Sequence, residues 1–275
     1  MNKLKINQAI EAAFAADAYC LGAHWIYDWK LLDSLDIDWQ GLNAPQAKWH
    51  TTKQKGDYTH YGDHGLWLHE FVLEYGQFDI LVYAEFWSNR MQSYTGYIDA
   101  SSRETLKALE LDPASPSGSD SNDLSIIGRI APLLLVSNNR EDFLESVENL
   151  VRLTHNSPRV IKAAAYFASV LFDVVEGLNI EQALARTQID PLLEDALHTA
   201  MESKGRSTTT TIRNFGPACG IEGAFEGVIH LLSSYDDYAD AIVANAKAGG
   251  DSAARGMLVG MIMGADGCSI PPAWH

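Results

Sequence analysis

The spacing of apolar residues constrains the fold of this chain more than any other feature. They recur at helical intervals in a series of segments bounded by capping residues or breakers, whereas strand signals are weak throughout. The predicted helices cover residues 7–23, 64–75, 79–94, 98–110, 123–136, 140–153, 157–176, 180–187, 191–203, 218–233, 236–248 and 252–265. No repeat, linker or low-complexity tract divides residues 1–275, so we expect one compact all-α domain.

Two stretches, residues 35–58 and 204–217, lack helical spacing, and long loops of this kind often carry function. We therefore expect both to border a cleft. The last predicted helix carries Gly256, Gly260 and Gly264 at four-residue intervals among apolar residues. Its apolar run is shorter than the roughly 20 residues needed to span a bilayer. This pattern predicts a buried helix that neighbouring backbones approach closely, with Asp251 at the bottom of the cleft.

Composition excludes several classes of partner. The 275 residues are 47% apolar, which is enough for a sizeable core. The formal net charge of −16 argues against nucleic acid or an anionic membrane as a partner. The three cysteines, Cys20, Cys219 and Cys268, show no pairing pattern. We expect a cytoplasmic protein without disulfides. Glu11 and Asp17 interrupt the apolar start of the chain, which predicts a core helix and not a signal peptide.

Two predicted helix starts, far apart in the sequence, are crowded with polar side chains. In residues 249–256, Asp251 is placed to cap a helix, and Arg255 follows one turn later on the same face. In residues 56–63, Thr59 is placed as a cap and is followed by His60 and Asp63 in the first turn. We expect the two helix starts to contribute to one site.

Further polar blocks lie before and between these segments. Residues 118–123 read Gly-Ser-Asp-Ser-Asn-Asp, residues 129–133 Arg-Ile-Ala-Pro-Leu and residues 153–158 Leu-Thr-His-Asn-Ser-Pro, with related blocks at 16–28 and 270–274. In order and spacing the whole set resembles the ADP-ribosylglycohydrolase family, to which the J-type lens crystallins are also similar. The resemblance covers nearly the whole chain. It implies the family's single domain of orthogonal helices and a small-molecule or ADP-ribosylated substrate.

The family's two metal-binding motifs are degenerate in this chain. The first, Thr-Asp-Asp-Thr, corresponds to residues 59–62, which read Thr-His-Tyr-Gly. The second, Asp-x-Asp followed by Thr or Ser, corresponds to residues 251–254, which read Asp-Ser-Ala-Ala. Mg²⁺ prefers several oxygen ligands, carboxylates above all. We therefore expect no metal cofactor, with Mg²⁺ or Mn²⁺ bound only if Thr59 and Asp251 retain part of the site.

Four residues are the catalytic candidates. Asp63 and Asp251 form the predicted carboxylate pair, and Arg255 is expected to supply the charge of the missing ions by pairing with both. The alternative for Arg255 is an ordinary ion pair with Asp251 on a solvated helix face. His60 is the fourth candidate; as a transition-metal ligand it would need further nitrogen or sulfur partners.

The resemblance places residues 118–123 at the ADP-ribose pocket, where hydroxyls and amides suit a ribose or a diphosphate. Asp123 is an alternative cap for the next helix there. His24 and Trp25 are expected to stack on a base or line a sugar pocket, or else to pack in the core. His24 with Asp28 is a weaker acid–base candidate, and His155 has a structural alternative. The predicted ligand-binding residues are Thr59, Tyr61, Ser119, Ser121, Asn122, Arg129, His155, Ser252, His24 and Trp25.

Three functions remain open from the sequence. The first is a hydrolase that cleaves a glycosidic bond of an ADP-ribose-like or other ribosyl compound without the usual dinuclear Mg²⁺ site. The second is a non-catalytic relative, similar to the J-type crystallins, that binds a nucleotide-like ligand or a protein partner. The third is a metal-dependent enzyme in which Asp57 and Asp63 replace the usual ligands.

Overall fold

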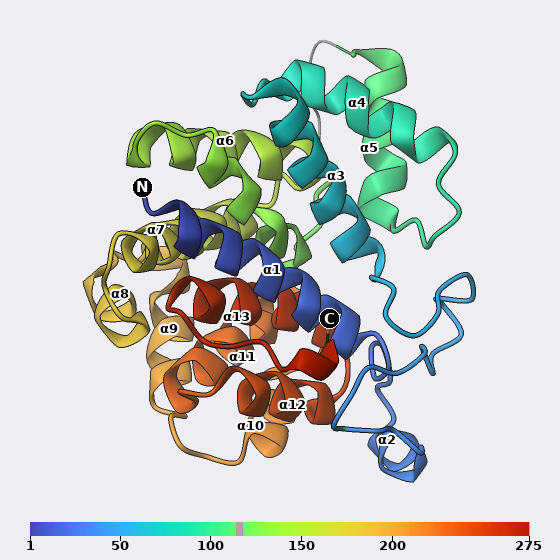
Figure 1. The fold of residues 1–275 in the computed structure, drawn as a ribbon, viewed down its shortest axis with the longest axis vertical. Coiled ribbons are helices and arrows are strands. Elements are labelled where there is room, and N and C mark those ends of the chain that lie inside the picture. Colours follow the sequence, from blue (N-terminus) through green and yellow to red (C-terminus); the bar gives the residue numbers. More distant parts are fainter. Residues whose placement is uncertain (114–117, 275) are drawn as a thin grey trace.

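The computed structural model describes residues 1–113 and 118–274, and in this part of the chain all regular elements are helical. The all-α prediction is confirmed. Helix α1 (Lys3–Cys20) lies at the centre against α13 (Ser252–Ala265), with α11 and α12 on one side of the pair (Figure 1). Helices α3, α4 and α5 form a separate group at the top of the view (Figure 1).

The remaining elements follow in chain order. They are α2 (Trp29–Ser34), α3 (His60–Tyr75), α4 (Ile80–Gln92), α5 (Ala100–Leu111), the 3₁₀ turns η1 (Ser125–Arg129) and η2 (Ala131–Leu135), α6 (Arg140–Thr154), α7 (Pro158–Val175), α8 (Ile180–Arg186), η3 (Pro191–Leu193), α9 (Glu194–Met201), α10 (Thr208–Phe215), α11 (Ile221–Ser234), α12 (Tyr238–Ala248) and η4 (Pro272–Trp274).

Helix α13 is buried along its whole length, as its glycine pattern predicts. A methyl group on Gly260 would lie 2.6 Å from the Ala12 carbonyl oxygen, and one on Gly264 would lie 2.5 Å from that of Gln8. Only glycine fits at these two positions, because the backbone of α1 lies directly against the backbone of α13 there. This contact fixes the start of α13, and with it Asp251, relative to the core.

Two of the sequence predictions for local structure are wrong. Residues 123–136 form η1 and η2 and not one α-helix. Pro132 has no backbone N–H to donate to an α-helical hydrogen bond. A Cβ on Gly128 would lie 2.8 Å from Met257 Cβ, so close packing against α13 also determines the backbone path of this segment. Residues 204–217 contain α10, whose Thr208 hydroxyl bonds to the buried His230 ring at 2.9 Å. Tertiary contact overrides weak helix propensity here.

Residues 35–58 contain no helix, as predicted, although the short α2 before them was not anticipated. In the described part of the chain every helix is too short or too polar to span a bilayer.

Candidate functional site

Asp251 is the buried centre of the site. It caps α13, as predicted, with Oδ1 accepting from the Ala254 amide at 3.4 Å. Its other oxygen, Oδ2, accepts from the Tyr61 hydroxyl at 3.0 Å and from the Trp25 indole at 3.1 Å. Burial raises the pKa of Asp251 above its ordinary value, although these donors and the nearby Arg255 oppose the shift. Three segments distant in the sequence therefore converge on one carboxylate.

A second carboxylate, Asp123, lies beside Asp251. One side-chain atom from each of Asp123, Cys219 and Asp251 lies within 4.8 Å of the other two. Burial, followed by the charge of Asp251, raises the pKa of Asp123 to about 7. Burial and the mutual repulsion of the two carboxylates therefore favour the protonated form of each acid.

Backbone pairing explains how the three side chains meet. The Leu124 amide donates to the Cys219 carbonyl at 2.9 Å, and the Ile221 amide donates to the Asn122 carbonyl at 2.7 Å. The Asp251 amide donates to the Pro217 carbonyl at 2.7 Å. The segment around residues 217–221 therefore holds both carboxylate-bearing segments.

Trp25 has an unusual backbone at this site. Its φ of 62° lies in the left-handed region, which is costly for a bulky residue. The conformation is held by its amide, which donates to the Gly250 carbonyl at 2.8 Å, and by the indole bond to Asp251. The His24 and His50 rings stack on the indole at centroid distances of 4.6 and 5.0 Å. Trp25 thus serves as a rigid wall of the site.

Four buried histidines lie around this wall, and three of their rings contact the Trp25 indole. His24, His50, His60 and His64 are all buried, and each has at least one ring nitrogen without a hydrogen-bond partner in the described structure. Burial lowers the pKa of His24, His50 and His64, so these rings are neutral at physiological pH. His60 Nε2 lies 3.5 Å from Asp99 Oδ2.

His50, His64 and Asp99 were not predicted from the sequence. The four-residue spacing of His60 and His64 would have placed these two rings on the same face of one helix.

Thr59 caps α3, as predicted. Its hydroxyl accepts from the Tyr61 amide at 3.1 Å and donates to Asp17 at 2.6 Å, and its amide also donates to Asp17 at 2.7 Å. Burial raises the pKa of Asp17 to about 7. Gly62 makes room for this contact, since a Cβ there would lie 2.5 Å from the Asp17 carboxylate. Asp17 is a buried acid that sequence analysis did not select.

The predicted network around Arg255 does not form. Asp63 bonds to Lys53 Nζ and to the Tyr94 hydroxyl, each at 2.5 Å. The ion pairs within 4.0 Å among the described residues include Asp63 but not Arg255. The predicted pairing of Arg255 with Asp63 and Asp251 is wrong.

The surface alternative is wrong as well, because Arg255 is 0% exposed. Its guanidinium donates to Asn245 Oδ1 at 2.9 Å, to the Pro217 carbonyl at 2.9 Å and to the Gly249 carbonyl at 2.6 Å. Arg255 therefore ties together the segments that carry Cys219 and Asp251.

The predicted ligand-binding residues are spread around the site. The Ser119 hydroxyl donates to the Thr154 carbonyl at 3.0 Å, and the Asn122 amide donates to Glu222 at 2.9 Å, so both donors are engaged. The Ser121 hydroxyl accepts from the Asp123 amide at 3.3 Å. His155 Nδ1 lies 2.8 Å from the Thr154 hydroxyl. The loop of residues 118–123 is largely braced by its neighbours.

Besides His24 and His60, three predicted residues are buried with a side-chain atom that lacks a hydrogen-bond partner within the described ranges, namely Arg129 Nε, His155 Nε2 and Ser252 Oγ. Burial lowers the pKa of Arg129, whereas nearby Asp99 and Asp123 oppose the shift. His24 and Asp28 do not form the predicted acid–base pair, because Asp28 caps α2 by accepting from the Lys30 and Leu31 amides.

Comparison with known proteins identifies the family of this chain. The family model described as ADP-ribosylglycohydrolase matches residues 4–275. The chain belongs to the ADP-ribosylglycohydrolase family. This membership confirms the resemblance seen in the sequence and supports a hydrolase-like function towards glycosidic bonds in general, on a small-molecule or ADP-ribosylated substrate.

Relatives of this family member include Crystallin J1A and Crystallin J1B from Tripedalia cystophora. They are 23% and 24% identical over 99% of this chain and 91% of their own lengths. A solved structure titled ADP-ribosylglycohydrolase-related protein complex aligns with a TM-score of 0.77 and 18% identity, over 99% of this chain and 92% of that one. This alignment confirms the fold of the family.

The residues present do not fit the family's pair of hard cations. Asp251 Oδ2 is already bonded to Tyr61 and Trp25, and the Thr59 hydroxyl is engaged by Asp17 and Tyr61. The alanines of residues 251–254 offer no side-chain oxygen. Two Mg²⁺ ions would therefore lack the carboxylate ligands that they require.

The substitute ligands Asp57 and Asp63 are also engaged, Asp57 by the Gln54 amide at 2.7 Å and Asp63 by Lys53.

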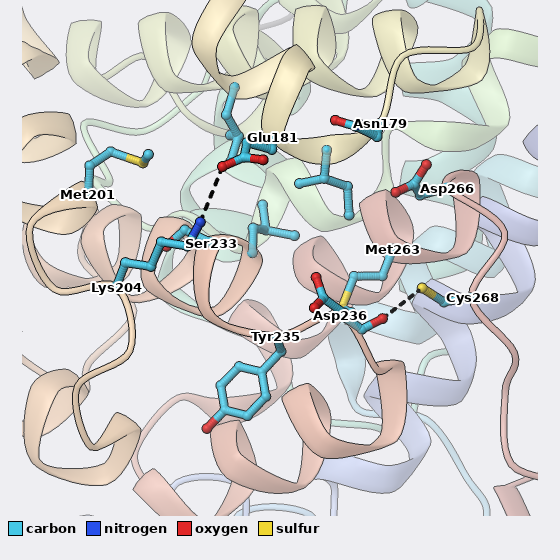
Figure 2. A pocket seen from close by; sticks show the side chains of 13 residues that line it. Asn179, Glu181, Met201, Lys204, Ser233, Tyr235, Asp236, Met263, Asp266 and Cys268 are labelled. Carbon is cyan, nitrogen blue, oxygen red and sulfur yellow. Dashed lines mark hydrogen bonds and ion pairs between the residues drawn. The ribbon is translucent and has the colours of Figure 1, made fainter.

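A cavity of about 270 Å³ lies elsewhere in this family member, between α8, α9, α11 and α13 (Figure 2). Its wall includes the ion pair of Lys204 with Glu181 and the half-buried Cys268, which contacts the Asp236 carbonyl (Figure 2). None of the predicted site residues lines it. The cavity is thus separate from the carboxylate cluster.

Proposed function

We propose that this protein hydrolyses a glycosidic bond of an ADP-ribose-like or other ribosyl compound, with Asp123 and Asp251 as its acid–base pair and without a dinuclear metal site. One observation carries the proposal, namely the close approach of Asp123 to Asp251, which begins the family's second metal motif, where this chain has lost a carboxylate. Most glycoside hydrolases use two carboxyl groups, about 5–5.5 Å apart in the retaining enzymes, and the ligand atoms of Asp123 and Asp251 lie within 4.8 Å of each other. The pair differs from the Asp63–Asp251 pair expected from the sequence.

In this proposal Asp123 is the protonated acid and Asp251 is its ionised partner. The protonated carboxyl donates its proton to the leaving-group atom as the bond to the ribose C1 breaks. The negative charge of the buried partner stabilises, without contact, the positive charge that develops on the sugar. Water then adds to C1 and returns one proton to the pair, which regenerates the starting state.

The two acids differ in access to a substrate. Asp123 is partly exposed, whereas Asp251 is 0% exposed and covered by Trp25 and Tyr61. Asp123 is therefore the group that reaches the leaving atom, and Asp251 sets its protonation. Tyr27 is 46% exposed, and the charge of Asp251 helps to raise its pKa, which supports an aromatic surface near the pair for a sugar or base.

The test is release of ADP-ribose from ADP-ribosylated protein in the presence of chelator. Asp123→Asn and Asp251→Asn should each lower the rate by about 100-fold or more, because each variant removes one carboxyl group of the acid–base pair. Asp120→Asn is the matched control, since Asp120 is exposed in the same loop. Full activity of Asp123→Asn, or activity that requires Mg²⁺, would contradict the proposal.

The complete burial of Asp251 favours a second candidate, a non-catalytic relative that binds a nucleotide-like ligand or a protein. Calorimetric titration with ADP-ribose, in chelator and in excess Mg²⁺, separates the two. Binding in chelator without any turnover would support the second candidate, whereas turnover in chelator would support the hydrolase.

A further inference from the structure

We propose that Asp123, Cys219 and Asp251 form a binding site for one transition-metal ion of the Zn²⁺ class. The three side chains each place one ligand-type atom within 4.8 Å of the other two. They come from the loop before η1, from the loop before α11 and from the cap of α13, so the fold and not local sequence brings them together.

The donor chemistry selects the metal. Two carboxylates and a thiol suit Zn²⁺, which binds sulfur at about 2.3 Å and carboxylate oxygen at about 2.0–2.2 Å. Thiolate ligands disfavour Mg²⁺ and Ca²⁺, which prefer oxygen alone. Three protein ligands leave the fourth tetrahedral position open. The site is therefore distinct in metal type and in ligands from a dinuclear Mg²⁺ centre.

The two carboxylates are already oriented by neighbouring donors, as metal-binding carboxylates usually are. Tyr61 and Trp25 both bond to Asp251 Oδ2, so Oδ1, with one long amide contact of 3.4 Å, is the oxygen left for an ion. The Ser125 amide donates to Asp123 Oδ1 at 2.7 Å, and the Cys219 thiol hydrogen-bonds to the same carboxylate.

An imidazole without a full set of partners also faces the cluster. His24 is 0% exposed, and its Nδ1 lies 3.6 Å from Asp251 Oδ1 while accepting from the Ala253 amide at 3.3 Å. Its Nε2 has no hydrogen-bond partner in the described residues. A buried polar ring in this state costs free energy unless a ligand or water compensates it. His24 therefore lies beside Asp251 with Nδ1 occupied by the Ala253 amide and Nε2 still without a partner.

Metal binding does not depend on turnover, although it uses the acid pair of the proposed hydrolase. An ion on Asp123 and Asp251 would displace the proton of Asp123. The zinc-loaded form would therefore be inhibited, and a failure of the hydrolase proposal would leave the metal site testable by spectroscopy alone.

The test is titration of the full-length apo-protein with Co²⁺, which reports thiolate ligation through a near-ultraviolet charge-transfer band. We expect one equivalent of Co²⁺ to produce this band and Zn²⁺, but not Mg²⁺, to remove it. Cys219→Ser should abolish the band, and Cys268→Ser, the matched control at another partly exposed cysteine, should keep it. Tyr61→Phe should weaken Zn²⁺ affinity by about 10- to 100-fold.

Alkylation of the unmutated protein provides a check that does not depend on the folding of a variant. Zn²⁺ should protect Cys219, and not Cys268, from iodoacetamide. Absence of the charge-transfer band, its persistence in Cys219→Ser, or equal alkylation of Cys219 with and without Zn²⁺ would each overturn the metal site.

Discussion

Replacement of Arg255 by Met tests whether this residue acts as a buried structural tie. The variant removes the donors to Asn245 Oδ1, to the Gly249 carbonyl and to the Pro217 carbonyl. The Pro217 carbonyl keeps the Asp251 amide as a donor. The Asn245 Oδ1 and the Gly249 carbonyl are therefore the two buried acceptors that lose their donor. Each unsatisfied acceptor costs about 1–3 kcal/mol, and loss of the guanidinium's own desolvation offsets part of this.

We expect Arg255→Met to lower the free energy of unfolding by about 3–5 kcal/mol, a large share of the 5–15 kcal/mol typical of a native protein. Urea unfolding followed by far-UV circular dichroism measures the change. Arg186→Met is the control, because Arg186 is exposed and the substitution should change stability by less than about 0.5 kcal/mol. A loss below about 1 kcal/mol in Arg255→Met would refute the structural role.

Three further outcomes are expected. Tyr61→Phe removes a donor to buried Asp251 and should lower the free energy of unfolding by about 1.5–3 kcal/mol in thermal denaturation; an unchanged stability would contradict the hydroxyl bond. Gly260→Ala should destabilise by about 1–3 kcal/mol in urea unfolding, because its Cβ would meet the Ala12 carbonyl at 2.6 Å; a stabilised variant would contradict the close helix contact. Asp17, with a folded-state pKa of about 7 against 3.8 for the free group, binds its proton more tightly when folded. Its contribution to stability is complete below pH 4 and falls as pH rises to 7, and Asp17→Asn should flatten this slope in pH-dependent unfolding.

Local signals in the sequence were sufficient for the caps of the site. Thr59 and Asp251 cap their helices because a short polar side chain before an apolar run satisfies free amides, a rule that involves only neighbouring residues. The glycines of α13 likewise predicted a buried helix because their spacing places them on one face.

The partners of these residues depend on contacts between distant segments. Asp123 and Cys219 lie beside Asp251 because the backbones of three loops pair with one another. The spacing of residues along the sequence does not predict such pairing. The four-residue spacing of Asp251 and Arg255 suggested an ion pair because that rule assumes an exposed helix face. In the buried α13, carbonyl groups compete for the guanidinium, and Arg255 bonds to them instead.

The packing of α1 against α13 has a consequence for synthesis of the chain. The apolar face of residues 3–20 has its main partner in residues 252–265, which leave the ribosome last among the helices of the core. Until then, α1 lacks the surface that covers it, and exposed apolar helices of this kind promote aggregation. Contacts of such high sequence separation also slow folding. We therefore expect the nascent chain to depend on holding chaperones until its final helix is made.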